Sequence, residues 1–150
     1  SDWFSEHISK DWNSLTGRCL KVLQEESDLQ EIVKLVGMDA LSPEDRIKLD
    51  VAQSIREDFL QQNAFLDVDS YTSLEKQYAM LHLIFRYNDE ALRAVRAGAD
   101  VEAVCELPVH ERIARAKTVP EADYKEEFAK IEQEIVSAAD RLIEEAREEE

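Results

Sequence analysis

The chain has few glycines for its length, with three in 150 residues. Gly17, Gly37 and Gly98 lie far apart. A Walker A loop or a GxGxxG turn needs clustered glycines to bring backbone N–H groups close to phosphate. The sequence therefore excludes a glycine-rich loop that holds a triphosphate, and we expect no ATP hydrolysis by this chain alone.

Cysteine and histidine motifs are also missing. Cys19 and Cys105 have no second cysteine or histidine close by in the sequence, which argues against a zinc site or a redox pair. His7, His82 and His110 form no HExxH pattern, and a lone histidine on a helix is usually a surface or satisfied core residue. The residues alone therefore predict neither a catalytic group nor a metal site.

Basic charge is scarce as well. The chain has 34 acidic and 18 basic residues and a formal net charge of -16. Such a field repels the phosphates of nucleic acids and anionic membrane surfaces, and the only basic cluster, "HERIARAK", contains acidic residues too. Apolar runs long enough to cross a membrane or to act as a signal segment are absent. We therefore expect a cytoplasmic protein without nucleic acid binding or direct membrane insertion.

Apolar residues recur at spacings of three and four, and strand-like alternation is almost absent. The chain is predicted to be all-α, a single domain over residues 1–150 that forms a bundle of about six to seven helices. Ser27 with Gln30 resembles a capping box, which predicts a new helix that Gly37 ends. Ser42 followed by Pro43 is the clearest helix start in the chain.

Further helices follow from the same signals. The helix after Ser42 is predicted to run to Gln62, and a long central helix runs from Ser73 to Ala97, where Gly98 closes it. Asp100 caps a short helix, Pro108 opens another, and a last helix runs from Glu121 to the end.

The last helix has a heptad-like apolar pattern and a strongly acidic composition, with 12 acidic and 4 basic residues from Glu121 onward. Its apolar series is Tyr124, Phe128, Ile131, Ile135, Ala138 and Leu142. This pattern fits a helix folded back on its own bundle, and it also fits a coiled-coil seam that binds a partner helix. A free-standing acidic module that binds a partner through this seam is therefore one functional hypothesis.

The stretch "REDFLQQNAF" contains two phenylalanines without an obvious common face. Phe59 continues the apolar series of Val51 and Ile55, which favours a core position. Phe65 follows the predicted helix end and has no amphipathic face to complete. The segment is either ordinary core or the wall of a pocket for a flat ligand.

Three strings in the sequence resemble one known family: "ESDLQEIVKLVGMDALSPEDRIKLDVAQSIREDFLQQNAF", "SLEKQYAML" and "LPVHERIARAK". They are similar to the C-terminal helical domain of the catalytic A (alpha) subunit of archaeal A-type and vacuolar-type rotary ATPases, which make or hydrolyse ATP. The resemblance extends from Trp3 and Phe4 to about Pro120, and the last helix matches mainly in character.

The resemblance implies that this chain is about the last quarter of a larger subunit, whose preceding domain holds the P-loop and binds ATP or ADP with Mg. Its partners would be the B subunits and the central-stalk rotor subunits of a proton- or sodium-translocating ATP synthase or ATPase. The chain would lie in the soluble head, peripheral to the membrane. The resemblance does not identify the transported ion or the direction of the reaction.

Two sites follow from the resemblance. One is a rotor-contact loop formed by Met38, Asp39, Ala40, Leu41, Ser42, Pro43, Glu44 and Asp45, for which a well-capped turn between helices is the alternative interpretation. The other is the adenine side of the nucleotide site. Phe65 would pack against the base with Ala64 and Gln62 beside it, and Phe59 is either a further contact or core.

Overall fold

The computed structural model describes residues 2–60 and 73–149 of the chain, with side chains from Lys10 onward. Long helices dominate this part: α1 (Asp2–Val36), α2 (Pro43–Ser54), α4 (Leu74–Arg96) and α7 (Tyr124–Glu148). The short elements are the 3₁₀ turns η1 (Met38–Ala40) and η3 (Ala116–Thr118), the π-helical segment η2 (Ile55–Leu60), and the helices α5 (Val101–Cys105) and α6 (Val109–Ala114). No strand occurs among the described residues, which confirms the all-α class.

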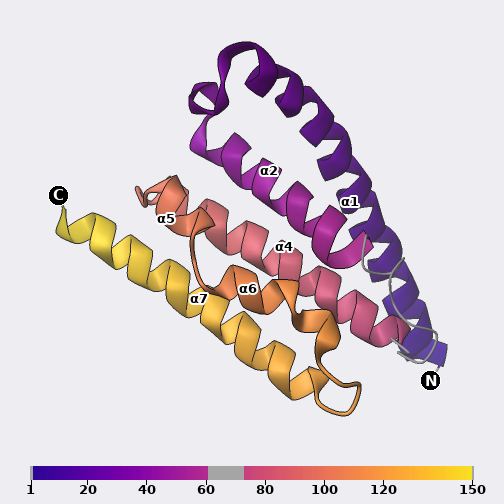
Figure 1. Cartoon of the computed structure of the whole chain (residues 1–150). Helices are drawn as coiled ribbons and strands as arrows, with labels where there is room; N and C mark the ends of the chain where they lie inside the picture. Colours follow the sequence, from indigo (N-terminus) through magenta and orange to yellow (C-terminus); the bar gives the residue numbers. More distant parts are fainter. Residues whose placement is uncertain (1, 61–72, 150) are drawn as a thin grey trace.

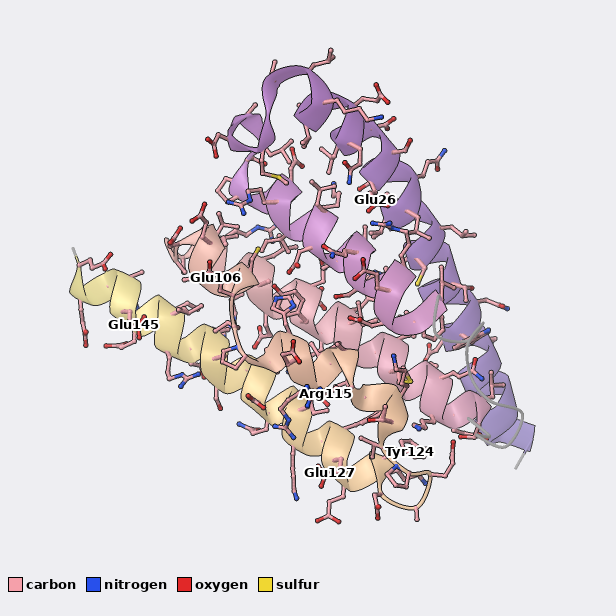
Figure 2. The ribbon with its side chains drawn as sticks, in the orientation of Figure 1. Glu26, Glu106, Arg115, Tyr124, Glu127 and Glu145 are labelled. Carbon is pink, nitrogen blue, oxygen red and sulfur yellow. The ribbon has the colours of Figure 1, made fainter. Side chains whose placement is uncertain are left out.

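The predicted helix start at Ser27 is wrong. Helix α1 continues from Asp2 to Val36 without a break, and Ser27 is an exposed residue inside it. Ion pairs with α2 and η2 hold the continuous helix directly before this point. Glu25 pairs with Lys48 at 2.7 Å, and Glu26, which Figure 2 labels on α1, pairs with Arg56 at 2.6 Å.

Helices α1 and α2 form a hairpin, and the predicted signals at its turn are confirmed. Gly37 adopts a φ of 91°, a conformation that favours glycine, and ends α1. The Ser42 side chain accepts a hydrogen bond from the Asp45 backbone N–H at 3.1 Å, and Pro43 occupies the first turn. In Figure 1 the hairpin runs along one side of the molecule and its turn lies at one end.

Helix α4 is the central element and packs against both α2 and α7. It begins beside Ser73, as predicted, and the Ser73 side chain caps its first turn; Gly98 follows its end with a φ of 102°, also as predicted. The main hydrophobic core joins these helices. It includes Ile47, Val51 and Ile55 of α2, Leu81, Ile84 and Phe85 of α4, and Ile131 and Ile135 of α7.

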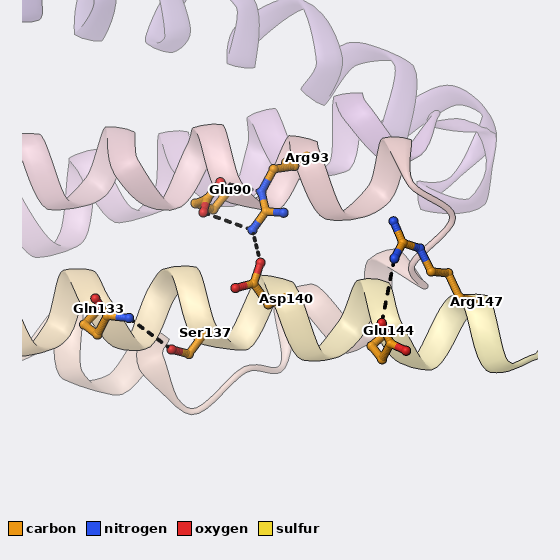
Figure 3. A network of polar contacts seen from close by, with 7 residues as sticks. All are labelled: Glu90, Arg93, Gln133, Ser137, Asp140, Glu144 and Arg147. Carbon is orange, nitrogen blue, oxygen red and sulfur yellow. Dashed lines mark hydrogen bonds and ion pairs between the residues drawn. The ribbon is translucent and has the colours of Figure 1, made fainter.

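Helix α7 folds back along α4, and its apolar series is buried inside the chain. Tyr124, Phe128, Ile131, Ile135 and Ala138 are buried, and Leu142 packs against the core. The fold-back interpretation is therefore confirmed, and these side chains do not offer a seam to a partner helix. Polar contacts reinforce the pairing: Figure 3 shows Arg93 of α4 between Glu90 of its own helix and Asp140 of α7, the latter at 2.6 Å.

The last helix begins three residues later than predicted, at Tyr124 instead of Glu121. The Glu121 carboxylate has another role, because it accepts hydrogen bonds from the backbone N–H of Ser73 at 2.7 Å and from the Ser73 hydroxyl at 2.9 Å. A carboxylate at this place also faces the positive end of the α4 dipole. The start of α4 is thereby attached to the loop before α7.

Candidate functional site

The turn of the α1–α2 hairpin exposes a group of apolar side chains, which we call the hairpin tip: Ile32, Leu35, Val36 and Met38. Leu35 is 81% exposed and Val36 is 65% exposed. They belong to the last turn of α1 and to η1, where Gly37 reverses the chain. Contiguous exposed apolar side chains are typical of a surface that binds another protein.

The hairpin tip rests on a small hydrophobic cluster of its own. Leu29, Leu41 and Leu49 are buried together, with Val33 packed against them, and this cluster is separate from the main core. Leu41 therefore belongs to the support of the turn, whereas most other members of the predicted rotor-contact loop are exposed. The structure thus brings Met38–Asp45 together at one end of the molecule, next to the exposed apolar group.

Of the three acidic residues in this loop, Asp39, Glu44 and Asp45, Glu44 is engaged within the chain. The Glu44 carboxylate accepts a hydrogen bond from Arg96 Nε at 2.8 Å, and this bond and the guanidinium charge lower the pKa of Glu44. Beside it, Arg46 of α2 reaches Glu102 of α5 at 3.3 Å. The hairpin tip itself consists of apolar side chains, and the Glu44 charge beside it is paired.

The predicted adenine contacts divide into two groups. Gln62, Ala64 and Phe65 lie outside the described residues. Phe59 lies in η2, is 6% exposed and belongs to the main core, where its ring centroid is 6.3 Å from that of Trp12. Segment η2 continues α2 with π-helical hydrogen bonding, a local change of geometry that is frequent near functional sites.

A buried polar cluster, which sequence reasoning missed, joins three helices. The Tyr87 hydroxyl of α4 donates a hydrogen bond to Asp50 Oδ2 of α2 at 2.6 Å. His110 Nε2 of α6 lies 2.8 Å from the Tyr87 oxygen and 3.1 Å from Asp50 Oδ2. Because the single phenolic proton points to Asp50, Nε2 of His110 must be the protonated nitrogen of the ring.

Burial and the neighbouring Asp50 carboxylate raise the pKa of Tyr87 far above its usual range, so the phenol stays neutral. The members of the cluster are separated by 37 and 23 residues in the sequence, and no spacing rule connects them. This arrangement contains a carboxylate, a phenol and an imidazole with their polar atoms paired to one another. It is suited to hold helices together.

Lys76 is a second polar group that the sequence did not reveal. Lys76 belongs to the first turn of α4, and the residue is only 3% exposed. Its Nζ donates hydrogen bonds to the backbone carbonyls of Lys117 at 2.7 Å and Val119 at 2.5 Å. Burial lowers the pKa of Lys76, and the Glu121 carboxylate partly opposes this shift. These bonds attach the segment after α6 to α4.

The remaining candidates show no catalytic features. Burial raises the pKa of Cys19 and of Cys105 to about 11, so both thiols stay protonated at neutral pH. Among the residues that the structure describes, no three His, Cys, Asp or Glu side chains are placed to hold a metal ion. None of the described helices has the length and apolar character that crossing a membrane requires.

Comparison with known proteins gives a consistent result. The family model described as the C-terminal domain of V and A type ATP synthase matches residues 1–105. The V-type ATP synthase alpha chain of Acetivibrio thermocellus is 50% identical over 141 residues, which are 94% of this chain and 24% of that protein.

Two clostridial proteins are similarly related. The V-type ATP synthase alpha chain of Clostridium perfringens strain 13 is 50% identical over 147 residues, covering 96% of this chain and 24% of the relative. Alpha chain 1 of Clostridium tetani is 51% identical over 121 residues, 81% of this chain and 20% of the relative. The chain thus spans about a quarter of the length of the curated relatives it matches.

Proposed function

Because the chain belongs to the family of C-terminal domains of V- and A-type ATP synthases, we propose that it works in the catalytic alpha subunit of such an enzyme and links nucleotide turnover to the rotor. In this proposal the chain lies in the soluble head, on the cytoplasmic side, beside B subunits and the central stalk. The observation that carries the proposal is the exposed apolar hairpin tip at the end of two paired helices.

The hairpin tip has the properties that a rotor contact requires. Leu35 and Val36 project from the end of α1, where the capped start of α2 and the buried Leu41 hold the turn in one conformation. Contact through apolar side chains is non-directional, so it can persist while the partner surface moves past it. A contact that depended on specific ion pairs would need a new set of partners at each position.

The test of this contact is a pair of substitutions at the hairpin tip in the assembled enzyme. Leu35→Ser with Val36→Ser removes two exposed apolar side chains, and burial of each contributes about 1.5–3 kcal/mol. We expect the central stalk to bind the head at least about tenfold more weakly, and fewer ions to be transported per ATP hydrolysed.

Leu20→Ser is the matched control, because Leu20 lies on the same helix, is 69% exposed and is not part of the hairpin tip. It should leave both stalk binding and ion transport unchanged. Equal behaviour of the tip variant and the control would refute the proposed contact.

We also propose that the segment with Gln62, Ala64 and Phe65 completes the adenine side of the nucleotide site in the full subunit. The family resemblance supports this role, and stacking of an aromatic ring on a base contributes about 1–3 kcal/mol. Phe59, which precedes this segment in the sequence, packs on Trp12 in the main core. The phosphates and Mg would be held by residues outside this chain.

Phe65→Ala in the full subunit tests the adenine contact. We expect the KM for ATP to rise about fivefold or more with a smaller change in kcat, because a contact to the base stabilises the ground state and the transition state alike. Phe59→Leu keeps an apolar side chain in the core and should leave the KM nearly unchanged. A rise in KM for Phe59→Leu alone would assign the base contact to Phe59 instead.

A further inference from the structure

A short segment, Val109–Thr118, lies across the longer helices, and we call it the strap. It consists of α6 and η3, and in Figure 1 it lies over α4 and α7. Apolar side chains hold it in place, since Val109, Ile113 and Ala116 are buried. Its polar groups then bond to three other helices, α2, α4 and α7.

The first attachment joins the strap to the hairpin and to α4. His110 Nε2 lies within hydrogen-bond distance of both Asp50 of α2 and Tyr87 of α4. Asp50 and His110 side chains are only about a fifth exposed, at 20% and 21%, so water competes little for these bonds. One imidazole thereby fixes the position of α2 relative to α4.

The other attachments join the strap to α7 and to the first turn of α4. Arg112 Nη1 donates to Glu134 of α7, and Nη2 lies 3.9 Å from Glu127, which Figure 2 labels on the same helix. At the end of the strap, Lys76 of α4 binds the Lys117 carbonyl at 2.7 Å. The strap is therefore bonded to α2, α4 and α7.

Apolar packing and polar bonds resist different movements. Apolar contacts between helices oppose separation, and because they are non-directional they tolerate small shifts of one helix along another. Hydrogen bonds with charged groups are directional and are lost when the partners shift by more than a fraction of their length. A force on the hairpin tip that acts along α2 would therefore be resisted by the polar bonds of the strap as well as by the packing.

We infer that the strap fastens the α1–α2 hairpin to α4 and α7, and that His110 and Arg112 are positioning residues which keep α2 in register when its tip is loaded. This inference rests on the proposed function of the hairpin tip. It concerns how displacement passes through the chain, and neither residue touches nucleotide or ions.

The experiment measures ions transported per ATP hydrolysed in the assembled enzyme with His110→Gln or Arg112→Gln. Arg112→Gln removes the ion pairs of the strap with α7 at a half-exposed position and leaves its buried apolar side chains unchanged, so the fold is retained. For each variant we expect the coupling ratio to fall by a factor of about 2 to 30, the range for residues that carry coupling between sites. The KM for ATP should stay within about twofold of the original value, because the nucleotide contacts are untouched.

Two matched controls carry the same substitutions at positions that do not fasten the strap. Arg115 is exposed and pairs at 3.5 Å with Glu111 inside the strap, so Arg115→Gln breaks no contact to another helix. His82 is exposed on α4 and lies 3.2 Å from Tyr78 of the same helix. Both Arg115→Gln and His82→Gln should keep the original coupling ratio.

The Leu35→Ser, Val36→Ser variant in the same assay separates the two hypotheses. If it lowers the coupling ratio while His110→Gln and Arg112→Gln do not, the hairpin tip acts as proposed and the strap inference is wrong. If His110→Gln lowers the melting temperature without changing the coupling ratio, the cluster is structural only, which also overturns the inference. An unchanged coupling ratio in the tip variant would refute the proposed function of the hairpin tip, and the strap inference, which rests on it, would be refuted as well.

Discussion

Replacing Tyr87 by phenylalanine tests how strongly the buried polar cluster binds α2, α4 and α6 together. The substitution removes one oxygen and leaves the ring, which is among the largest fully buried side chains of the chain. The oxygen donates to Asp50 at 2.6 Å and lies 2.8 Å from His110 Nε2. No cavity larger than a hydroxyl group results, so the change in stability reports the hydrogen bonds.

The magnitude follows from what replaces these bonds. A hydrogen bond to a charged group contributes about 1.5–3 kcal/mol. Part of this is recovered, because Asp50 and His110 are already 3.1 Å apart and remain able to bond directly. We therefore expect Tyr87→Phe to lower the free energy of unfolding by about 1–2 kcal/mol, and the melting temperature by about 2–8 °C for a domain of this size.

The pH dependence gives the same test a second readout. Burial, followed by the Asp50 charge, raises the pKa of Tyr87 in the folded chain above that of an unfolded tyrosine, about 10. Because the folded pKa is raised, the contribution of Tyr87 to stability is complete below the unfolded pKa of about 10 and is lost as the pH rises above it. The stability difference between the original chain and Tyr87→Phe should therefore shrink above about pH 10.

Urea denaturation at neutral and alkaline pH measures both effects. Tyr78→Phe is the control for loss of a phenolic hydroxyl from the same helix, because its hydroxyl donates to Asp11 at 3.0 Å on the surface. This control should cost less than about 0.5 kcal/mol, the usual range for surface substitutions. A Tyr87→Phe chain as stable as the original would refute the argument, since the cost of burying the polar atoms would then equal the gain from their bonds.

Three further substitutions have expected outcomes in the same assay. Ser42→Ala removes the cap that accepts from the Asp45 N–H and should cost about 1 kcal/mol, whereas Ser27→Ala, inside α1, should cost nothing measurable. Lys76→Met should cost about 1–3 kcal/mol at neutral pH, because two backbone carbonyls lose their charged donor. Burial lowers the pKa of Lys76 in the folded chain below the pKa of an unfolded lysine. The original chain therefore gains stability from this group as the pH rises from the folded pKa to the unfolded pKa. Lys76→Met should lack this gain.

The parts of the fold that depend on neighbouring residues were predictable. The caps at Ser42, Ser73 and Asp100 accept from backbone N–H groups two or three residues ahead, so the signal and its effect lie in the same short stretch. Glycines at positions 37 and 98 end helices by the same local logic. Ser27 had an equally good local signal, but α1 continues through it and makes contacts with α2 and η2, some 20 to 30 residues away.

The candidate site was less predictable because its determinants are distant in sequence. The hairpin turn was located from its caps, but its exposed apolar surface depends on which side of α1 packs against α2. The Asp50–Tyr87–His110 cluster needs three helices to meet, and each member alone resembles an ordinary surface or core residue. Roles for Phe65 and its neighbours rest on resemblance to a family, since periodicity does not distinguish a base contact from core.

The wrong prediction at Ser27 bears on how the hairpin can work. A helix boundary there would place a flexible joint between the hairpin tip and the main core, and a force on Leu35 would bend that joint before it reached α4. Helix α1 instead runs for 35 residues, about 50 Å, without a break. The tip has only a small hydrophobic cluster beneath it, so the continuous backbone hydrogen bonding of α1 and its ion pairs with α2 and η2 must supply the stiffness. The ion pairs of Glu25 and Glu26, which a prediction from neighbouring residues could not include, are therefore also contacts that allow the hairpin to transmit a displacement.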